Sequence, residues 1–308
     1  MASRHQLAKI GYMAVDIAII GNCQSAPLAR VLAGQPGLNV KYHLDINNKG
    51  GPLFTEQVPL IIAEAREGRL AVVTHPLKTS FGELSSANLQ QLPVVRTYTN
   101  IYFEGLHPDI TVLGAFQARL RSPIGDYHSS IVVGAWLQGL NVADCLGRFN
   151  HVTYEKLGYY KKFSDSANKL LDRESAVDIR FVSEFIGMLR TTPSLYTVNH
   201  PTMEVITAQA RGICAAFGLT PSLFPGSFHY SPLASAAWWP IYPEFAEAHG
   251  IVYETPFLFK RSTADGKMVY FALEAFVQAS YRFLDMSGQE KIRSCVQVPG
   301  ILAAQAGL

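Results

Sequence analysis

Residues 15–34 read VDIAIIGNCQSAPLARVLAG, and this stretch decides how the chain begins to fold. Residues 15–20 form a short apolar run that is typical of a buried strand. Gly21-Asn22-Cys23-Gln24 follows as a turn, and apolar residues then recur at helical spacing from residue 28. Ser25 is expected to cap this helix, because a serine side chain can accept a hydrogen bond from the first free N–H groups. The stretch therefore predicts a strand, a sharp turn and a helix.

Outward from this stretch, strand and helix patterns alternate over the first hundred residues. Extended segments are expected at 38–46, 70–74 and 94–99, and a second helix at 58–67. Such alternation favours a mostly parallel sheet with helices on its faces.

From residue 129 onward the pattern changes to helices. They are expected over 131–143, from 164 or 165 to 189, from 202 to 218, and over 269–284. We therefore predict an α/β fold with a mostly parallel sheet in the N-terminal part and a predominantly helical C-terminal part. The expected organisation is one compact domain over residues 1–308, with an α/β part at 15–128 and a mainly helical part at 129–308.

The composition excludes several classes of protein. The 308 residues are 48% apolar and 16% charged, which is too apolar for a disordered chain. The 26 basic residues barely exceed the 24 acidic residues, so we expect no nucleic-acid partner. Mean hydropathy is +0.11, but no run approaches the roughly 20 apolar residues of a membrane span.

The N-terminus and the cysteines indicate a cytoplasmic protein. Arg4, His5 and Lys9 precede an apolar run that is broken by Asp16, and no clean cleavage site follows, so we expect no secretory signal. The four cysteines are far apart and form no CxxC pair, and disulfides are not expected in the cytoplasm.

Cys23 is the candidate nucleophile. A cysteine that follows the first strand and precedes a helix lies where open α/β sheets place reacting groups. The helix N-terminus favours the thiolate, and the Gln24 N–H with the Asn22 or Gln24 side-chain amide could stabilise an oxyanion. The alternative is that Cys23 is a small buried residue in a turn.

Three histidines are candidates for the base. His200 lies in Asn199-His200-Pro201-Thr202 between an extended segment and a helix. His107 lies two residues before Asp109, which could orient its imidazole as the acid of a triad does. His128 follows Tyr127 at a helix start. Each of them could instead be a turn residue that bonds only to backbone or to water.

Metal and nucleotide motifs are missing from the sequence. It contains no HExxH motif, no closely spaced histidine pair and no GxGxxG or GxxxxGK[ST] loop, so we predict no metal. Small basic clusters could still hold one phosphate group, and Lys161-Lys162 after Tyr159-Tyr160 could accommodate an adenine and its phosphates. Such pairs are more often solvated surface.

Several segments in this order resemble one known family. They are Gly21-Asn22-Cys23-Gln24, residues 103–109 (FEGLHPD), residues 123–128 (PIGDYH) and Asn199-His200-Pro201-Thr202. Together they resemble the WcbI-type polysaccharide-biosynthesis acetyltransferases over about residues 15 to 218. Cys23 corresponds to the cysteine of the first segment and His200 to the histidine of the last.

The resemblance implies a cytoplasmic bacterial enzyme of capsular polysaccharide biosynthesis that transfers an acetyl group from coenzyme A to a sugar hydroxyl. The site is expected to combine Cys23 with His200, His107 and Asp109. Substrate or cofactor contacts are expected from Asn22, Gln24, Tyr127, His128, Lys161 and Lys162. The implied partners are coenzyme A and a sugar or polysaccharide acceptor, while the oligomeric state stays open.

Two other functions fit the same residues. An esterase or deacetylase of SGNH-like logic would use the same turn and histidine but give the acyl group to water. A non-catalytic glycan-binding protein would instead use Trp238, Trp239 and Tyr242 as a stacking surface, with Cys23 structural; these aromatics could equally be core. A direct transfer without an acyl-enzyme is also compatible with the sequence.

Overall fold

The fold is described by a computed structural model over residues 14–222, 231–263 and 265–308. Residues 1–13, for which the sequence predicts no secretory signal, lie outside this part of the chain. The chain forms two compact units. The first comprises residues up to Asn100, Ala176–Phe181 and a segment that begins at Ile206, and the second comprises the rest. The units divide after Asn100, whereas the sequence suggested one domain with a division after residue 128.

The first unit contains a four-stranded parallel sheet with the order β2-β1-β3-β4, which confirms the predicted α/β class. Its strands are β1 (Val15–Gly21), β2 (Leu38–Asp45), β3 (Ala71–Thr74) and β4 (Val95–Thr97). Its helices are α1 (Ser25–Ala33), α2 (Pro52–Arg66) and α3 (Ser86–Leu89), with 3-10 turns η1 (Ile46–Asn48) and η2 (Thr79–Leu84).

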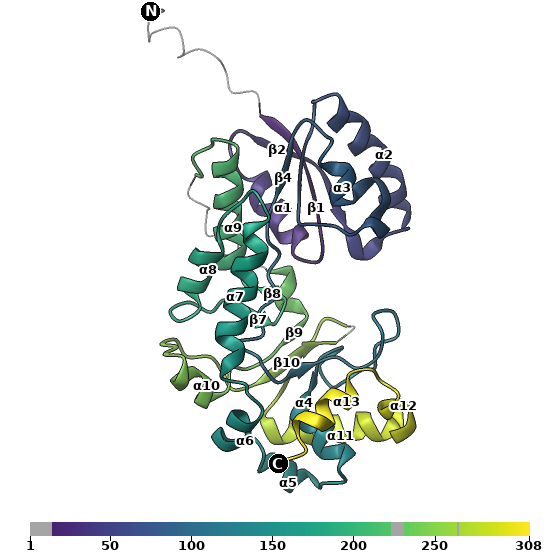
Figure 1. The fold of residues 1–308 in the computed structure, drawn as a ribbon, viewed down its shortest axis with the longest axis vertical. Helices are drawn as coiled ribbons and strands as arrows, with labels where there is room; N and C mark the ends of the chain where they lie inside the picture. The colour runs from purple at the N-terminus through teal and green to yellow at the C-terminus, as the bar shows by residue number, and fades with distance from the viewer. Residues whose placement is uncertain (1–13, 223–230, 264) are drawn as a thin grey trace, which may run out of the picture. The chain divides into compact units, whose positions relative to one another are not determined.

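Strand β1 is central, and helices α1 and α2 lie on opposite sides of the sheet (Figure 1). Residues 17–20 are therefore fully buried, which explains why this strand reads as a continuous apolar run. Helix α2 begins at Pro52 and not near residue 58. The helix accommodates Pro59 in its interior.

The second unit is largely helical, as predicted, and carries three small antiparallel sheets. Its strands pair as β5 (Ile110–Thr111) with β6 (His128–Ser129), β7 (Leu195–Thr197) with β8 (His200–Pro201), and β10 (Phe259–Ser262) with both β9 (Ala237–Trp238) and β11 (Met268–Phe271). Its helices are α4 (Ser130–Leu137), α5 (Val142–Leu146), α6 (His151–Lys156), α7 (Lys161–Ser175), α8 (Val182–Met188), η3 (Pro232–Ser235), α10 (Pro243–Ala248), α11 (Leu273–Ser287), α12 (Gln289–Arg293) and α13 (Val298–Ala304). Helix α9 (Met203–Ala216) begins in this unit and continues into the first.

Three further predicted helices, all beyond residue 128, differ from the structure. The helix expected over 131–143 is interrupted at Gly139, which has a positive φ of 76°. The helix expected from 164 to 189 is two helices, because residues 176–181 leave it to join the first unit. The helix expected over 269–284 starts at Leu273, since residues 268–271 pair with β10 instead.

Within the described ranges, no helix is both long enough and apolar enough to cross a membrane.

Candidate active site

The strand order places the Cys23 turn at the switch point of the sheet. From β1 the chain moves outward to β2, and then crosses back to β3 on the other side of β1. Ligands of open parallel sheets bind at the carboxyl ends of the strands beside such a reversal. Cys23 follows the end of β1, Asp45 ends β2 and His75 follows the end of β3. This edge of the first unit is therefore the candidate active site.

Hydrogen bonds to Asn22 hold the Cys23 turn in shape. The Gln24 N–H donates to Asn22 Oδ1 at 3.0 Å, and the Ser25 N–H and hydroxyl both donate to the Asn22 carbonyl, at 2.8 and 2.7 Å. The Gln24 N–H already has Asn22 Oδ1 as an acceptor, so its use as an oxyanion donor would require sharing this hydrogen bond and stays a prediction. Ser25 is also the first helical residue and not the cap, since its hydroxyl turns back to Asn22.

The Cys23 thiol is half-buried, and its surroundings disfavour the thiolate. Burial and, second to it, the nearby Asp45 carboxylate together raise the pKa of Cys23 to about 11. The N–H groups of Cys23 and Gln24 act in the opposite direction but are outweighed. The expectation that the helix start would make Cys23 a thiolate is therefore wrong for the protein alone. Cys23 is a thiol at neutral pH and needs a base in order to react.

His43 is a candidate base that the sequence analysis missed. Its Nε2 lies 2.9 Å from Ser25 Oγ. The Ser25 hydroxyl donates its one hydrogen to the Asn22 carbonyl. Nε2 of His43 must therefore carry a hydrogen and donate it to Ser25 Oγ. Burial lowers the pKa of His43, while Asp45 acts to raise it. Asp45 thus influences both the thiol and the imidazole.

His75 and Tyr98 complete the same sheet edge, and the sequence analysis missed both. Their rings meet edge to face with centroids 6.0 Å apart. A Cβ at Gly21 would lie 2.6 Å from Tyr98 Oη, so the glycine is needed for the close approach of this ring to the end of β1. Burial and the proximity of Cys23 raise the pKa of Tyr98. The signal that could have found these residues is their place at the ends of β3 and β4.

A pocket of about 390 Å³ opens beside the end of β2. It is lined by His43, Leu44, Asp45, Asn48, Gly51, Pro52, Leu53 and Phe54. Gly51 precedes the first turn of α2, and the two titratable residues of this pocket are the same pair that surrounds the Cys23 turn. The first unit therefore offers a ligand-sized space whose lining includes Asp45, the carboxylate that acts on Cys23.

The predicted triad of His107 and Asp109 does not form. Both residues lie in the second unit and are fully buried. Asp109 accepts hydrogen bonds from the Ser130 hydroxyl, the Ile131 N–H and the Tyr159 and Tyr242 hydroxyls, at 2.7 to 3.0 Å. Through these bonds the Asp109 carboxylate anchors the start of α4. Asp109 is therefore a structural residue and not the orienting acid of His107. Burial lowers the pKa of His107 to about 4.

His200 and Tyr127 do lie together in the second unit. Their rings meet edge to face with centroids 6.0 Å apart, and Tyr127 donates to Asn199 Oδ1 at 2.7 Å. Burial lowers the pKa of His200 to about 4, and its Nδ1 has no hydrogen-bond partner among the described residues. The role of His200 as base stays a prediction. His128, in contrast, is buried and its Nε2 donates to the Leu120 carbonyl at 3.1 Å, which fits a structural role.

Tyr159 and Lys162 are already held by other residues of the protein and do not fit the predicted adenine site, whereas a cofactor contact from Lys161 stays a prediction. Tyr159 is buried and bonded to Asp109, so its ring is not a free platform. Lys162 donates to the Pro108 carbonyl at 2.9 Å and lies over the Tyr159 ring. Lys161 is exposed on the surface of α7.

All four cysteines are free. Cys145, Cys214 and Cys295 are buried, so Cys23 is the most accessible of the four. Over residues 14–222, 231–263 and 265–308, no three His, Cys, Asp or Glu side chains gather in a way that could hold a metal ion.

Comparison with known proteins gave two matches. The family model described as "Polysaccharide biosynthesis enzyme WcbI" matches residues 16–222. A solved structure of WcbI, described as a novel polysaccharide biosynthesis enzyme in its native form without a disulfide bond between coenzyme A and a cysteine, is similar with a TM-score of 0.73. The similarity covers 95% of this chain and 99% of that chain at 17% identity, and it shows a shared fold. No curated protein matches this chain.

Proposed function

The chain belongs to the WcbI family of polysaccharide biosynthesis enzymes, and from this premise we propose that it is a cytoplasmic acetyltransferase that moves an acetyl group from coenzyme A to a sugar hydroxyl. The observation that carries the proposal is the position of Cys23. It is a half-buried free thiol at the switch point of a parallel sheet, beside a pocket that contains His43 and Asp45.

The pocket at the start of α2 suits the donor arm. Its walls combine apolar side chains, such as Leu53 and Phe54, with the polar groups of His43 and Asn48. A pantetheine arm has the same mixed character, because its amide groups alternate with methylene groups. The proposal is therefore that the arm lies in this pocket and that its acyl group reaches Cys23, on which the pocket residue Asp45 also acts.

In the proposed reaction, Cys23 Sγ attacks the carbonyl carbon of the acetyl thioester, and the bond to the sulfur of coenzyme A breaks. The proton of Cys23 passes to a base and then to the departing sulfur. A sugar hydroxyl next attacks the acetyl group on Cys23; its proton passes to a base and then to the released Cys23 sulfur. Because Cys23 has a pKa of about 11, removal of its proton is a required part of the first step.

Three histidines are proposed as bases. His43 lies in β2 two residues before its end, His75 directly follows β3, and both strands flank β1. His200 is the histidine of the family-like motif. We expect that replacing the histidine that takes the Cys23 proton with glutamine slows the acetylation of Cys23. Replacing the histidine that takes the sugar proton should slow only the second step, the transfer of the acetyl group to the sugar.

The test is intact-mass spectrometry of the protein with acetyl coenzyme A. The parent protein should gain one acetyl group and the Cys23→Ala variant should gain none. An adduct that survives the substitution would remove Cys23 as the nucleophile, and transfer without any adduct would indicate direct attack by the sugar. Coenzyme A should also raise the melting temperature, because a ligand that binds only the native state stabilises it. No shift at saturating coenzyme A would favour the hydrolase alternative.

A further inference from the structure

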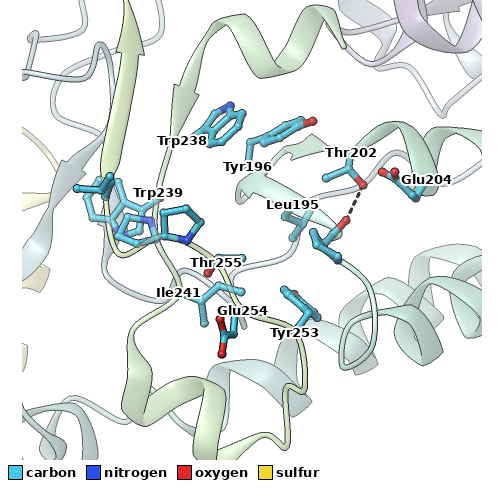
Figure 2. Close-up of a pocket in the computed structure, with 14 residues that line it drawn as sticks. Leu195, Tyr196, Thr202, Glu204, Trp238, Trp239, Ile241, Tyr253, Glu254 and Thr255 are labelled. Carbon is cyan, nitrogen blue, oxygen red and sulfur yellow. Dashed lines mark hydrogen bonds between the residues drawn. The ribbon is translucent and has the colours of Figure 1, made fainter. Parts of the chain in front are cut away.

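The second unit contains a separate pocket of about 320 Å³ (Figure 2). Its walls come from β7, the start of α9, the residues that follow β9 and the segment at 253–258. They include four aromatic side chains, which are Tyr196, Trp238, Trp239 and Tyr253. This volume lies at the lower end of the range for small-molecule sites, which is about 300 to 1,000 Å³.

The aromatic wall of this pocket is rigid. The rings of Tyr196 and Trp238 stack with centroids 5.1 Å apart and an interplanar angle of 18°. The Trp238 indole N–H donates to the Ala234 carbonyl at 2.8 Å, and the Lys260 ammonium lies 3.6 Å from the centre of the Trp238 ring. A backbone hydrogen bond from the Trp239 N–H to the Tyr196 carbonyl ties the two strands together. The wall is therefore held in place before any ligand binds.

One polar group of the lining, the Tyr253 hydroxyl, has no hydrogen-bond partner of its own among the described residues. Figure 2 shows Tyr196 and Trp238 side by side at one end, with Tyr253 and Glu254 at the other. The Tyr253 hydroxyl is buried and has no hydrogen-bond partner among the described residues, a situation that costs free energy unless a ligand supplies one. Burial raises the pKa of Tyr253 to about 12, so the hydroxyl keeps its proton and can donate.

The charge of the lining is negative. Glu204 and Glu254 both contribute to it, and no lysine or arginine is among the lining residues. The Lys260 ammonium packs behind the lining on the Trp238 ring and donates to the Ala234 carbonyl. Carboxylates accept hydrogen bonds from hydroxyl and ammonium groups and repel other carboxylates. The pocket thus combines an aromatic wall, a free hydroxyl and acceptor oxygens, which matches a pyranose ring with one apolar C–H face and a rim of hydroxyls.

We propose that this pocket binds a non-acidic sugar residue, neutral or amino, of the acceptor glycan. The statement that the bound sugar belongs to the acceptor glycan rests on the proposed function. The residues that would bind the sugar all lie in the second unit. The proposed site also revises the stacking surface expected from Trp238, Trp239 and Tyr242. Tyr242 is bonded to Asp109 in the core, whereas Tyr196 takes its place beside Trp238.

The test is binding of methyl glycosides of glucose, glucosamine and glucuronic acid, measured by saturation-transfer NMR and by titration of tryptophan fluorescence. The glucoside and the glucosaminide should bind, and the glucuronide should bind at least about tenfold more weakly. Tyr253→Phe should weaken glucoside binding by about three- to tenfold, the loss expected for one hydrogen bond. Glu254→Gln should reduce the discrimination against the glucuronide, and Glu247→Gln on α10, which does not line the pocket, is the matched control.

Every other outcome overturns the proposal. Binding of none of the three glycosides, tightest binding of the glucuronide, or glucoside binding that Tyr253→Phe leaves unchanged would each do so. Tetramethylammonium binding without sugar binding would identify the pocket as a site for small amines. The melting shift with coenzyme A, measured on the same proteins, separates the two proposals. A shift without sugar binding removes only this pocket, and sugar binding without a shift removes only the acetyltransferase.

Discussion

Replacing Asp45 with asparagine should make Cys23 more reactive. The Asp45 carboxylate is the second cause, after burial, of the raised pKa of Cys23. Asparagine has the same shape and keeps the side-chain oxygen that accepts from the Asn47 N–H at 2.9 Å, so the variant removes the charge and preserves the turn.

The magnitude follows from the thiolate population. A pKa of about 11 in place of 9.0 lowers the thiolate fraction at pH 8 about 100-fold. The more basic thiolate is intrinsically about eightfold more nucleophilic, so alkylation of Cys23 should be about tenfold slower than that of a peptide thiol. Asp45→Asn should lower this pKa toward its ordinary value, and only in part, because burial, the larger cause, remains. The variant should therefore react faster at pH 8, by about threefold for each unit by which the pKa falls.

The assay is the rate of alkylation by iodoacetamide between pH 7 and 10, followed by intact mass and peptide mapping. Because the folded pKa is raised, the logarithm of the parent rate should still climb by one for each pH unit up to pH 10. The Asp45→Asn rate should level off at a lower pH than the parent rate, because its thiol has the lower pKa. Cys23→Ala measures the background from the three buried cysteines.

Asp16→Asn is the matched control. It makes the same charge change at the other end of β1, which is more than about 15 Å away along the strand. A parent rate that levels off below pH 9 would refute the raised pKa. An equal response to both variants would refute the role given to Asp45.

Two further predictions concern the supports of the site. Tyr242→Phe removes one hydrogen bond of 2.7 Å to the buried Asp109 and should lower the free energy of unfolding by about 2 kcal/mol in urea, with the acetyl-transfer rate unchanged. A slower transfer at unchanged stability would instead restore a catalytic role for Asp109. Gly21→Ala should cost about 1 to 3 kcal/mol, because its Cβ would meet Tyr98 Oη at 2.6 Å. Adding Tyr98→Phe should recover most of that loss, and a double variant as unstable as the single one would show that the strain lies elsewhere.

Local patterns in the sequence were sufficient to predict the elements around Cys23. The apolar run before Gly21, the turn and the following helical spacing each involve only neighbouring residues. A strand that is buried on both faces of its sheet consists of consecutive apolar residues, so its burial can be recognised in the sequence. The parallel sheet, the helical character of the second half and the place of Cys23 after the first strand are all visible in this way.

Contacts between distant residues were not predictable by the same means. His107 and Asp109 are close in sequence, yet Asp109 bonds to hydroxyls that lie up to 133 residues away. His43, His75 and Tyr98 reach the Cys23 edge only because the chain reverses its direction across the sheet after β2.

The sequence by itself determined the strand, turn and helix that present Cys23 and the motifs that identify the family, because both depend on residue order alone. Only the tertiary structure decided which side chains surround the thiol and whether it is ionised. Strand order selects the neighbours, and burial together with the Asp45 carboxylate outweighs the backbone N–H groups that act on Cys23.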